Sequence, residues 1–334
     1  MLLATDDRFL LHETGPFHPE RPSRLTAVAR GLEIAGLGEV LVPFSPRPAT
    51  TAEIELVHAP SLVSGLARLA ELGGGDVDAD TVVGPESFEA ARLAAGAGLD
   101  AAERLQAGGG DFAFLALRPP GHHARPGEAM GFCLLNNVAI TAASLAGRGL
   151  RVAIVDYDAH HGNGTQEAFY DRGDVLYVSV HQHPLYPGTG RSGQRGSGNG
   201  VGATLNIPVP AGAAGDTYRA AFDELVVPAL HRFSPDWLLV SAGFDAHRAD
   251  PLTDLGLTAG DFADLSARLV GLVPPGRTLV FLEGGYDLSA LAASAGAAVA
   301  AFAGSDYRPE PASSAGPGKD VVARIVAEQA REQG

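Results

Sequence analysis

The sequence predicts an α/β fold of three layers (αβα), in which helices cover both faces of a central, mainly parallel sheet. Two observations support this prediction. Five short apolar runs, each bounded by turn residues, have the length and the unbroken hydrophobicity of strands buried on both faces. Helical patterns separate most of these runs, and this alternation is typical of a parallel sheet. The predicted strands are 112–117, 152–155, 175–180, 237–240 and 278–282.

The helices are predicted from apolar periodicity together with signals for their ends. Ser87 is the expected N-cap of one helix, and Thr258 and Asp261 have capping-box spacing at the start of another. Glycine triplets at 73–75 and 108–110 mark breaks. The predicted helices are 21–36, 60–72, 87–106, 131–146, 216–233, 260–273 and 288–305.

The 334 residues are expected to form a single domain, 1–334, because α/β chains of this length often form one large domain. Hydrophobic residues make up 46% of the chain and charged residues 19%, which is ordinary for a globular protein and excludes disorder, collagen and a coiled coil. Residues 188–202 hold seven glycines and predict a long surface loop. A Pro/Ser/Gly-rich segment, 306–318, leads into a predicted final helix at 319–330.

Charge and composition exclude several kinds of partner. The net charge of −15 repels phosphate backbones, so no nucleic-acid partner is expected. The first eleven residues lack the pattern of a secretory signal, and the uncharged stretch 288–305 is too weakly apolar to span a membrane. The one cysteine, Cys133, excludes an intrachain disulfide. We expect a cytoplasmic protein without a membrane partner; the oligomeric state is left open.

A polar cluster follows each of the five predicted strands. Seven of the 11 histidines of the chain fall in these clusters. Ligands of open parallel sheets bind beyond the carboxyl ends of the strands, so we expect the clusters to converge into one site rich in His, Asp and Tyr. The clusters are 118–123, 156–164, 181–183, 241–247 and 283–287.

One of these clusters predicts a metal site. Asp158 and His160 are two residues apart as the chain leaves a strand, so both side chains can point to one place. Asp245, after another strand, can supply a third ligand. Two carboxylates and one imidazole suit a divalent ion with an open position for water, and the absence of cysteine from the clusters argues against a closed structural zinc site.

Hydrolysis also needs groups that move protons and stabilise negative charge. His122 and His123 offer adjacent imidazoles for proton transfer. Tyr286 offers a phenol that can donate to a developing oxyanion. It follows Gly284 and Gly285, a pair that by itself would indicate an ordinary turn.

Together and in this order, these residues resemble the histone deacetylase / acetylpolyamine amidohydrolase family. The resemblance covers roughly residues 10 to 305. It starts at His12 and the segment 18–22, continues through 85–87 and ends at 283–286. The segment 155–166 is the most specific part, and with Asn163, Thr165 and Gln166 it resembles the class II branch of the family.

The resemblance implies a zinc-dependent amide hydrolase on the arginase–deacetylase α/β fold, with Zn²⁺ or Fe²⁺ as the metal and K⁺ as a structural ion. It implies that His123 is the general base and acid, and that Asp156 and Asn163 are the partners of the paired histidines. The implied metal ligands are Asp158, His160 and Asp245, and the implied catalytic residues are His122, His123, Tyr286, Asp156 and Asn163. The implied monovalent-cation site comprises Asp156, Asp158, His160, Ser179 and Val180, and the implied substrate tunnel comprises Phe132, Tyr186 and Leu252.

The expected reaction is removal of acetyl or other acyl groups from the lysine side-chain amine in proteins or peptides. A small acetylated amine is the alternative, since polyamine-directed relatives carry an acid near the tunnel mouth. Leu252 occupies that place here, and Arg248 nearby would repel a polycation, although the net charge of −15 would attract one. Both features favour acetyl-lysine as the substrate.

Two further classes are less well supported by the residues. A dinuclear manganese ureohydrolase needs extra bridging carboxylates, but Gly162 and His247 stand at the places where that pattern has them. A non-catalytic module that binds acyl-lysine or metal would have lost a ligand or the tyrosine, and here all are present. His247 itself is expected to be a solvated histidine at the rim of the site.

Overall fold

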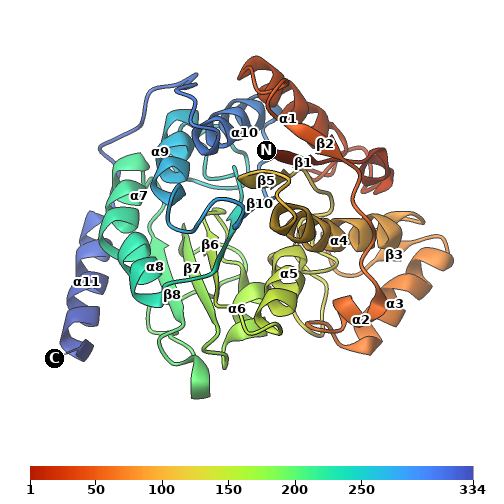
Figure 1. The fold of residues 1–334 in the computed structure, drawn as a ribbon, viewed down its shortest axis with the longest axis horizontal. Helices are drawn as coiled ribbons and strands as arrows, with labels where there is room; N and C mark the ends of the chain where they lie inside the picture. The colour runs from red at the N-terminus through yellow and green to blue at the C-terminus, as the bar shows by residue number, and fades with distance from the viewer. Residues whose placement is uncertain (334) are drawn as a thin grey trace.

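A computed structural model, which describes residues 1–333, centres on an eight-stranded sheet in the order β2-β1-β5-β10-β9-β6-β7-β8 (Figure 1). Every neighbouring pair in this sheet is parallel. This confirms the predicted α/β fold with a central parallel sheet. The strands are β1 (Leu2–Ala4), β2 (Val42–Phe44), β5 (Phe112–Leu115), β6 (Val152–Asp156), β7 (Val175–Gln182), β8 (Thr204–Val209), β9 (Trp237–Ala242) and β10 (Thr278–Leu282).

Helices pack on the sheet in two groups (Figure 1). In one group α10 lies against both α1 and α9, and α7 contacts α9 and α11. In the other group α5 contacts α4 and α6, and these helices also contact strands of the sheet. The helices are α1 (Ser23–Ile34), α4 (Ser87–Gln106), α5 (Asn137–Ala146), α6 (Asn163–Phe169), α7 (Gly215–Ala221), α8 (Val227–Phe233), α9 (Ala259–Leu269), α10 (Leu288–Phe302) and α11 (Lys319–Gln333).

Short elements complete the fold. A small antiparallel pair of strands forms apart from the main sheet, and a π-helical turn joins α7 to α8. Within residues 1–333 no helix combines the length and apolar character needed to cross a membrane. These short elements are η1 (Asp7–Leu11), α2 (Thr51–Ile54), α3 (Pro60–Glu71), β3 (Gly75–Asp76), β4 (Val82–Val83), η2 (Gly198–Gly200) and η3 (Phe222–Val226).

A close approach between α1 and α10 fixes the N-terminal part of the chain against the C-terminal part. An added Cβ at Gly31 would stand 2.0 Å from the carbonyl oxygen of Ala292, so only glycine fits there. Because α1 comes this near, Arg24 on its first turn can reach the carboxyl end of β10.

Several predicted boundaries differ from the structure. The predicted helix 131–146 begins only at Asn137, because Gly131 and Phe132 have φ of 56° and 67° and Asn136 supplies the cap. Ser87 lies inside α4 rather than capping it, and its hydroxyl accepts the amide of Gly84 and contacts His12. The capping box of Thr258 and Asp261 is present as predicted.

Candidate metal centre and active site

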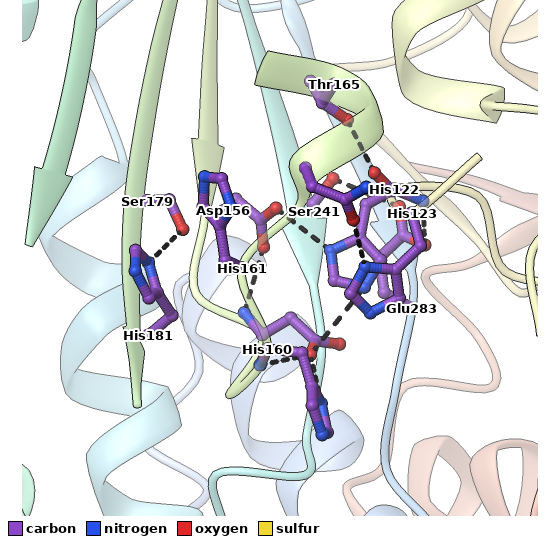
Figure 2. A network of polar contacts seen from close by, with 12 residues as sticks. His122, His123, Asp156, His160, His161, Thr165, Ser179, His181, Ser241 and Glu283 are labelled. Carbon is purple, nitrogen blue, oxygen red and sulfur yellow. Dashed lines mark hydrogen bonds and ion pairs between the residues drawn. The ribbon is translucent and has the colours of Figure 1, made fainter. Parts of the chain in front are cut away.

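The polar clusters meet at the carboxyl ends of adjacent strands, as the sequence predicts. Asp158 and His160 follow β6, Asp245 follows β9, and Tyr286 follows β10. His122 and His123 lie in the loop after β5, the other neighbour of β10. Figure 2 shows the two histidines, Asp156, His160 and Glu283 gathered at this edge of the sheet.

Asp158, His160 and Asp245 are all buried, and one ligand atom from each lies within 4.8 Å of the others. Nδ1 of His160 is 2.8 Å from Oδ2 of Asp245 and 3.2 Å from Oδ1 of Asp158. Burial and the neighbouring charge of Asp158 raise the pKa of Asp245 to about 7. A cation would stabilise two carboxylates so close together out of water, and the donor set of one nitrogen and two oxygens fits a divalent ion.

Backbone amides orient both carboxylates toward that point. Oδ2 of Asp158 accepts the amide of Gly284 at 2.8 Å, and Oδ1 of Asp245 accepts the amide of Ala159 at 2.8 Å. An added Cβ at Gly284 would lie 2.5 Å from Asp245 and 2.6 Å from Asp158. Glycine is therefore required beside the triad, since any side chain would displace both carboxylates.

The two adjacent histidines have opposite electrostatic environments. Nδ1 of His122 is 3.1 Å from Oδ2 of Asp156. Burial alone would lower the pKa of His122, but the charges of Asp158 and Asp156 outweigh it and raise the pKa to about 10. Burial lowers the pKa of His123 well below its ordinary value, and the charges of His122 and His160 add to the effect.

His123 has the geometry of a base directed at the site. Its Nδ1 lies 2.8 Å from the side-chain oxygen of Asn163, so Nδ1 carries the proton. Nε2 of the neutral ring is then the acceptor. His123 also lines a cavity of about 220 Å³ together with His160 and Tyr286.

The three predicted tunnel residues line this same cavity. The rings of Phe132 and Tyr286 pack edge to face with their centroids 5.7 Å apart. The rings of Tyr186 and His123 do the same with their centroids 5.3 Å apart. Tyr186 and Leu252 are 40% and 37% exposed, which places them toward the opening. The full lining is Asp80, His123, Gly131, Phe132, His160, Leu185, Tyr186, Leu252 and Tyr286.

Asp156 is a shared acceptor beneath the site. Its carboxylate accepts the Tyr177 hydroxyl at 3.0 Å and the Asp158 amide at 3.1 Å, besides facing His122. In the sheet register Asp156 stands opposite Ser179 of β7. The Ser179 hydroxyl lies 2.8 Å from Nδ1 of His181, and the sequence did not predict this contact. Val180, next in β7, is buried.

A buried ionic network supports the turn that carries Tyr286. Nε of Arg24 donates to the carbonyl of Gly285 at 2.7 Å, and the guanidinium lies 5.0 Å from the centre of the Tyr286 ring. Glu20 pairs with Arg24 and also with Arg118, all with fully buried side chains. The sequence placed Glu20 in a motif but offered no signal for these distant partners.

Glu283 supports the paired histidines in a similar way. Its buried carboxylate accepts the amides of Gly121 at 2.7 Å and His122 at 3.2 Å, and the hydroxyl of Ser241 at 3.1 Å. Burial raises its pKa to about 7. Glu283 therefore fixes the backbone at the start of the histidine pair through hydrogen bonds.

The prediction for His247 was wrong. This residue is only 5% exposed rather than solvated at the rim. Its Nδ1 accepts the amide of Ala249 at 3.1 Å, so its Nε2 donates to Glu310 at 2.8 Å. Glu310 lies in the segment 306–318, which folds back onto the loop after Asp245 and supplies the partner that the local sequence lacks.

Comparison with known proteins gives consistent matches. A model of the histone deacetylase domain matches residues 18–302. A probable deacetylase of Archaeoglobus fulgidus is 41% identical over 90% of this chain and 85% of its own length. A histone deacetylase-like amidohydrolase of Pseudomonas aeruginosa is 39% identical over 81% of this chain and 73% of its own length. The crystal structure of the HDA15 HD domain matches with a TM-score of 0.91 and 38% identity, over 99% of this chain and 96% of that one.

Proposed function

This chain belongs to the histone deacetylase family, and from that premise we propose that it hydrolyses the bond between an acetyl group and the side-chain amine of lysine in proteins or peptides. The observation that carries the proposal is the single cavity lined by His123, His160 and Tyr286 behind aromatic walls. An unbranched lysine stem suits such a passage, and its amide would then meet all three groups.

Asp158, His160 and Asp245 would hold the metal, for which we propose Zn²⁺ with Fe²⁺ as the alternative. When bound, the ion supplies Lewis-acid activation of the attacking water and of the acyl carbonyl. The chain itself supplies the remaining groups. Their environments support the roles that the family resemblance implies.

In this mechanism Nε2 of His123 takes a proton from the attacking water and returns it to the leaving amine. His122 faces the Asp156 carboxylate, which orients its imidazole and favours its charged form beside the negative charge of the transition state. The Tyr286 hydroxyl donates to the carbonyl oxygen as it becomes an oxyanion. Phe132 and Tyr186 hold the stem of the substrate and keep water away.

We also propose a structural K⁺ near the metal, bound by Asp156, Asp158, His160, Ser179 and Val180. The parallel register supports this, because Asp156 and Ser179 stand opposite each other. Oxygen donors from a side chain, a hydroxyl and the backbone suit a hard monovalent cation. Such an ion would also offset the carboxylate charge beneath the site.

A small acetylated amine remains the second candidate, and Asp80 favours it. Asp80 lines the cavity, and its negative charge would attract a cationic substrate. Arg248 offers less repulsion than the sequence suggested, because it is paired with Glu310 at 2.8 Å. Leu252, also in the lining, still favours the lysine side chain over a polyamine.

The ureohydrolase alternative has a steric obstacle. A Cβ at position 162 would lie 2.3 Å from the Asp156 carboxylate and 2.7 Å from the Tyr177 hydroxyl. A bridging carboxylate therefore has no room at Gly162. The side chain of His247 is hydrogen-bonded to Glu310, so it does not supply a ligand for a second metal ion either.

The test is a screen of the purified protein against acetyl-lysine peptides and acetylpolyamines, with elemental analysis of the same sample. We expect turnover of the peptides and about one divalent ion per chain, because three ligands form one metal site. Turnover of polyamines alone would favour the second candidate. Two manganese ions per chain without amide hydrolysis would overturn the proposal, and peptide binding without turnover would indicate a non-catalytic module.

Asp156→Ala should lower kcat/KM by roughly 10- to 100-fold, because groups that orient ligands and catalytic histidines have effects of that size. The variant loses the partner of His122 and the acceptor of the Asp158 amide. Steady-state kinetics and metal content are measured together. Asp223→Ala is the control, since Asp223 pairs with Arg268 on the surface. Unchanged kinetics in Asp156→Ala would contradict its role as partner of His122.

A further inference from the structure

Asp250 connects two walls of the cavity. Its side chain is 7% exposed and lies in the loop that runs from Asp245 to Leu252. Oδ2 accepts the backbone amide of Tyr286 at 2.7 Å, and Oδ1 accepts the amide of Leu252 at 3.0 Å. The two residues that donate these hydrogen bonds, Tyr286 and Leu252, both line the cavity. One carboxylate therefore fixes the tyrosine and the opposite part of the opening together.

The turn before Tyr286 requires such a support. Gly285 has φ of 117°, and a glycine pair leaves the backbone free to adopt many conformations. Arg24 holds the carbonyl of Gly285, while Asp250 holds the next amide, that of Tyr286. The peptide that carries the phenol is thus held on both sides.

Asp250 is itself fixed close to the metal ligands. Its amide donates to the carbonyl of His247 at 2.8 Å, and the hydroxyl of Thr253 donates to the carbonyl of Asp245 at 2.6 Å. The loop from Asp245 to Thr253 is therefore closed on itself. Any group bonded to Asp250 keeps a defined place relative to Asp245.

We propose that Asp250 is a positioning residue for the oxyanion donor: it sets the Tyr286 hydroxyl relative to the metal site and joins its position to the Leu252 wall. This inference rests on the proposed deacetylase function. Asp250 touches no reacting atom, so its effect passes through Tyr286. A donor displaced by about 1 Å can cost on the order of 100-fold in rate, because the developing charge is met only at the right distance.

A purely structural role predicts a different result, and a double-mutant cycle separates the two. We expect Asp250→Ala to lower kcat by about 10- to 100-fold in the native background. In the Tyr286→Phe background the same change should lower kcat by less than about 3-fold, since the donor is already absent. Asp250→Asn keeps one oxygen to accept the Tyr286 amide and should recover part of the loss.

The control is Asp100→Ala, a carboxylate that is 8% exposed, accepts the amide of Arg47 and is not part of the cavity lining. It should change the melting temperature without changing kcat. Metal content should remain at the native value in every variant. The affinity for a hydroxamate chelator is measured in the same set, because a chelator bound at the metal site would lie in the cavity that Tyr286 lines and needs no turnover.

Equal losses of kcat in both backgrounds would overturn the inference, as would a loss of metal in Asp250→Ala. Full retention of kcat and of chelator affinity in Asp250→Ala would overturn it as well. Failure of the proposed function looks different, because the native protein would then turn over no acetylated amine. In that case the cycle of chelator affinities still decides whether Asp250 acts through Tyr286.

Discussion

Asp245→Ala should lose the metal and the activity together. Removing a group that merely orients a metal ligand costs about 10- to 100-fold, so removing the ligand itself should cost more than about 100-fold in kcat/KM. Only Asp158 and His160 would remain of the triad. Elemental analysis should find close to zero divalent ion per chain in the purified variant.

Thermal unfolding gives an independent measurement of the same change. Added metal should raise the melting temperature of the native protein, because an ion that binds only the folded state stabilises it. The shift should be absent in Asp245→Ala. Asp254→Ala is the matched control, since this carboxylate lies in the same loop but contacts Gln182. A variant at Asp245 that retains one ion per chain would show that the ligand set is wrong.

Tyr286→Phe changes one oxygen and should lower kcat by about 100- to 1000-fold, the effect of removing one oxyanion donor. The hydroxyl acts mainly in the transition state, so KM should change little. Metal content should stay at the native level, and the ring should still pack on Arg24 and Phe132. Kinetics and elemental analysis of one preparation check all of these points.

Ionisation of the Tyr286 phenol should also cause no change in kcat with pH near neutrality. Burial raises the pKa of Tyr286 well above its ordinary value, so the hydroxyl keeps its proton at any pH below that range. Donation is therefore present throughout the working range. Full activity in Tyr286→Phe would mean that the carbonyl is activated without the phenol, and loss of metal would make the tyrosine structural.

The strands that were predicted share one property: they are buried on both faces. Residues of β5, β6, β7, β9 and β10 are all buried, so each appears in the sequence as an apolar run. β1 and β2 are only three residues long, too short for a pattern. β8 contains Asn206 and Pro208, which interrupt the apolar run that would have predicted a strand. It forms a strand in the structure by pairing in parallel with β7.

The residues expected to do chemistry could be named from the sequence because they lie at strand ends and carry unusual side chains in a fixed order. Among their supports, Asp156 and Asn163 were named through the family resemblance, but others could not be. Asp250 and Glu283 act by accepting hydrogen bonds from backbone amides of residues far away in the chain. Every residue except proline has such an amide, so the sequence does not indicate which one a carboxylate will contact. His247 was misjudged for the same reason, because its partner Glu310 is 63 positions away.

The place of β10 in the sheet has a consequence for synthesis of the chain. β10 is the last strand made, yet it lies between β5 and β9 and joins two halves of the sheet (Figure 1). A nascent chain that ends before Thr278 would lack the strand that pairs with both β5 and β9, and unpaired strand edges are prone to aggregation. It also lacks Glu283 and Tyr286. Activity therefore requires β10 and the loop that follows it, and a fragment cut before Thr278 should be inert.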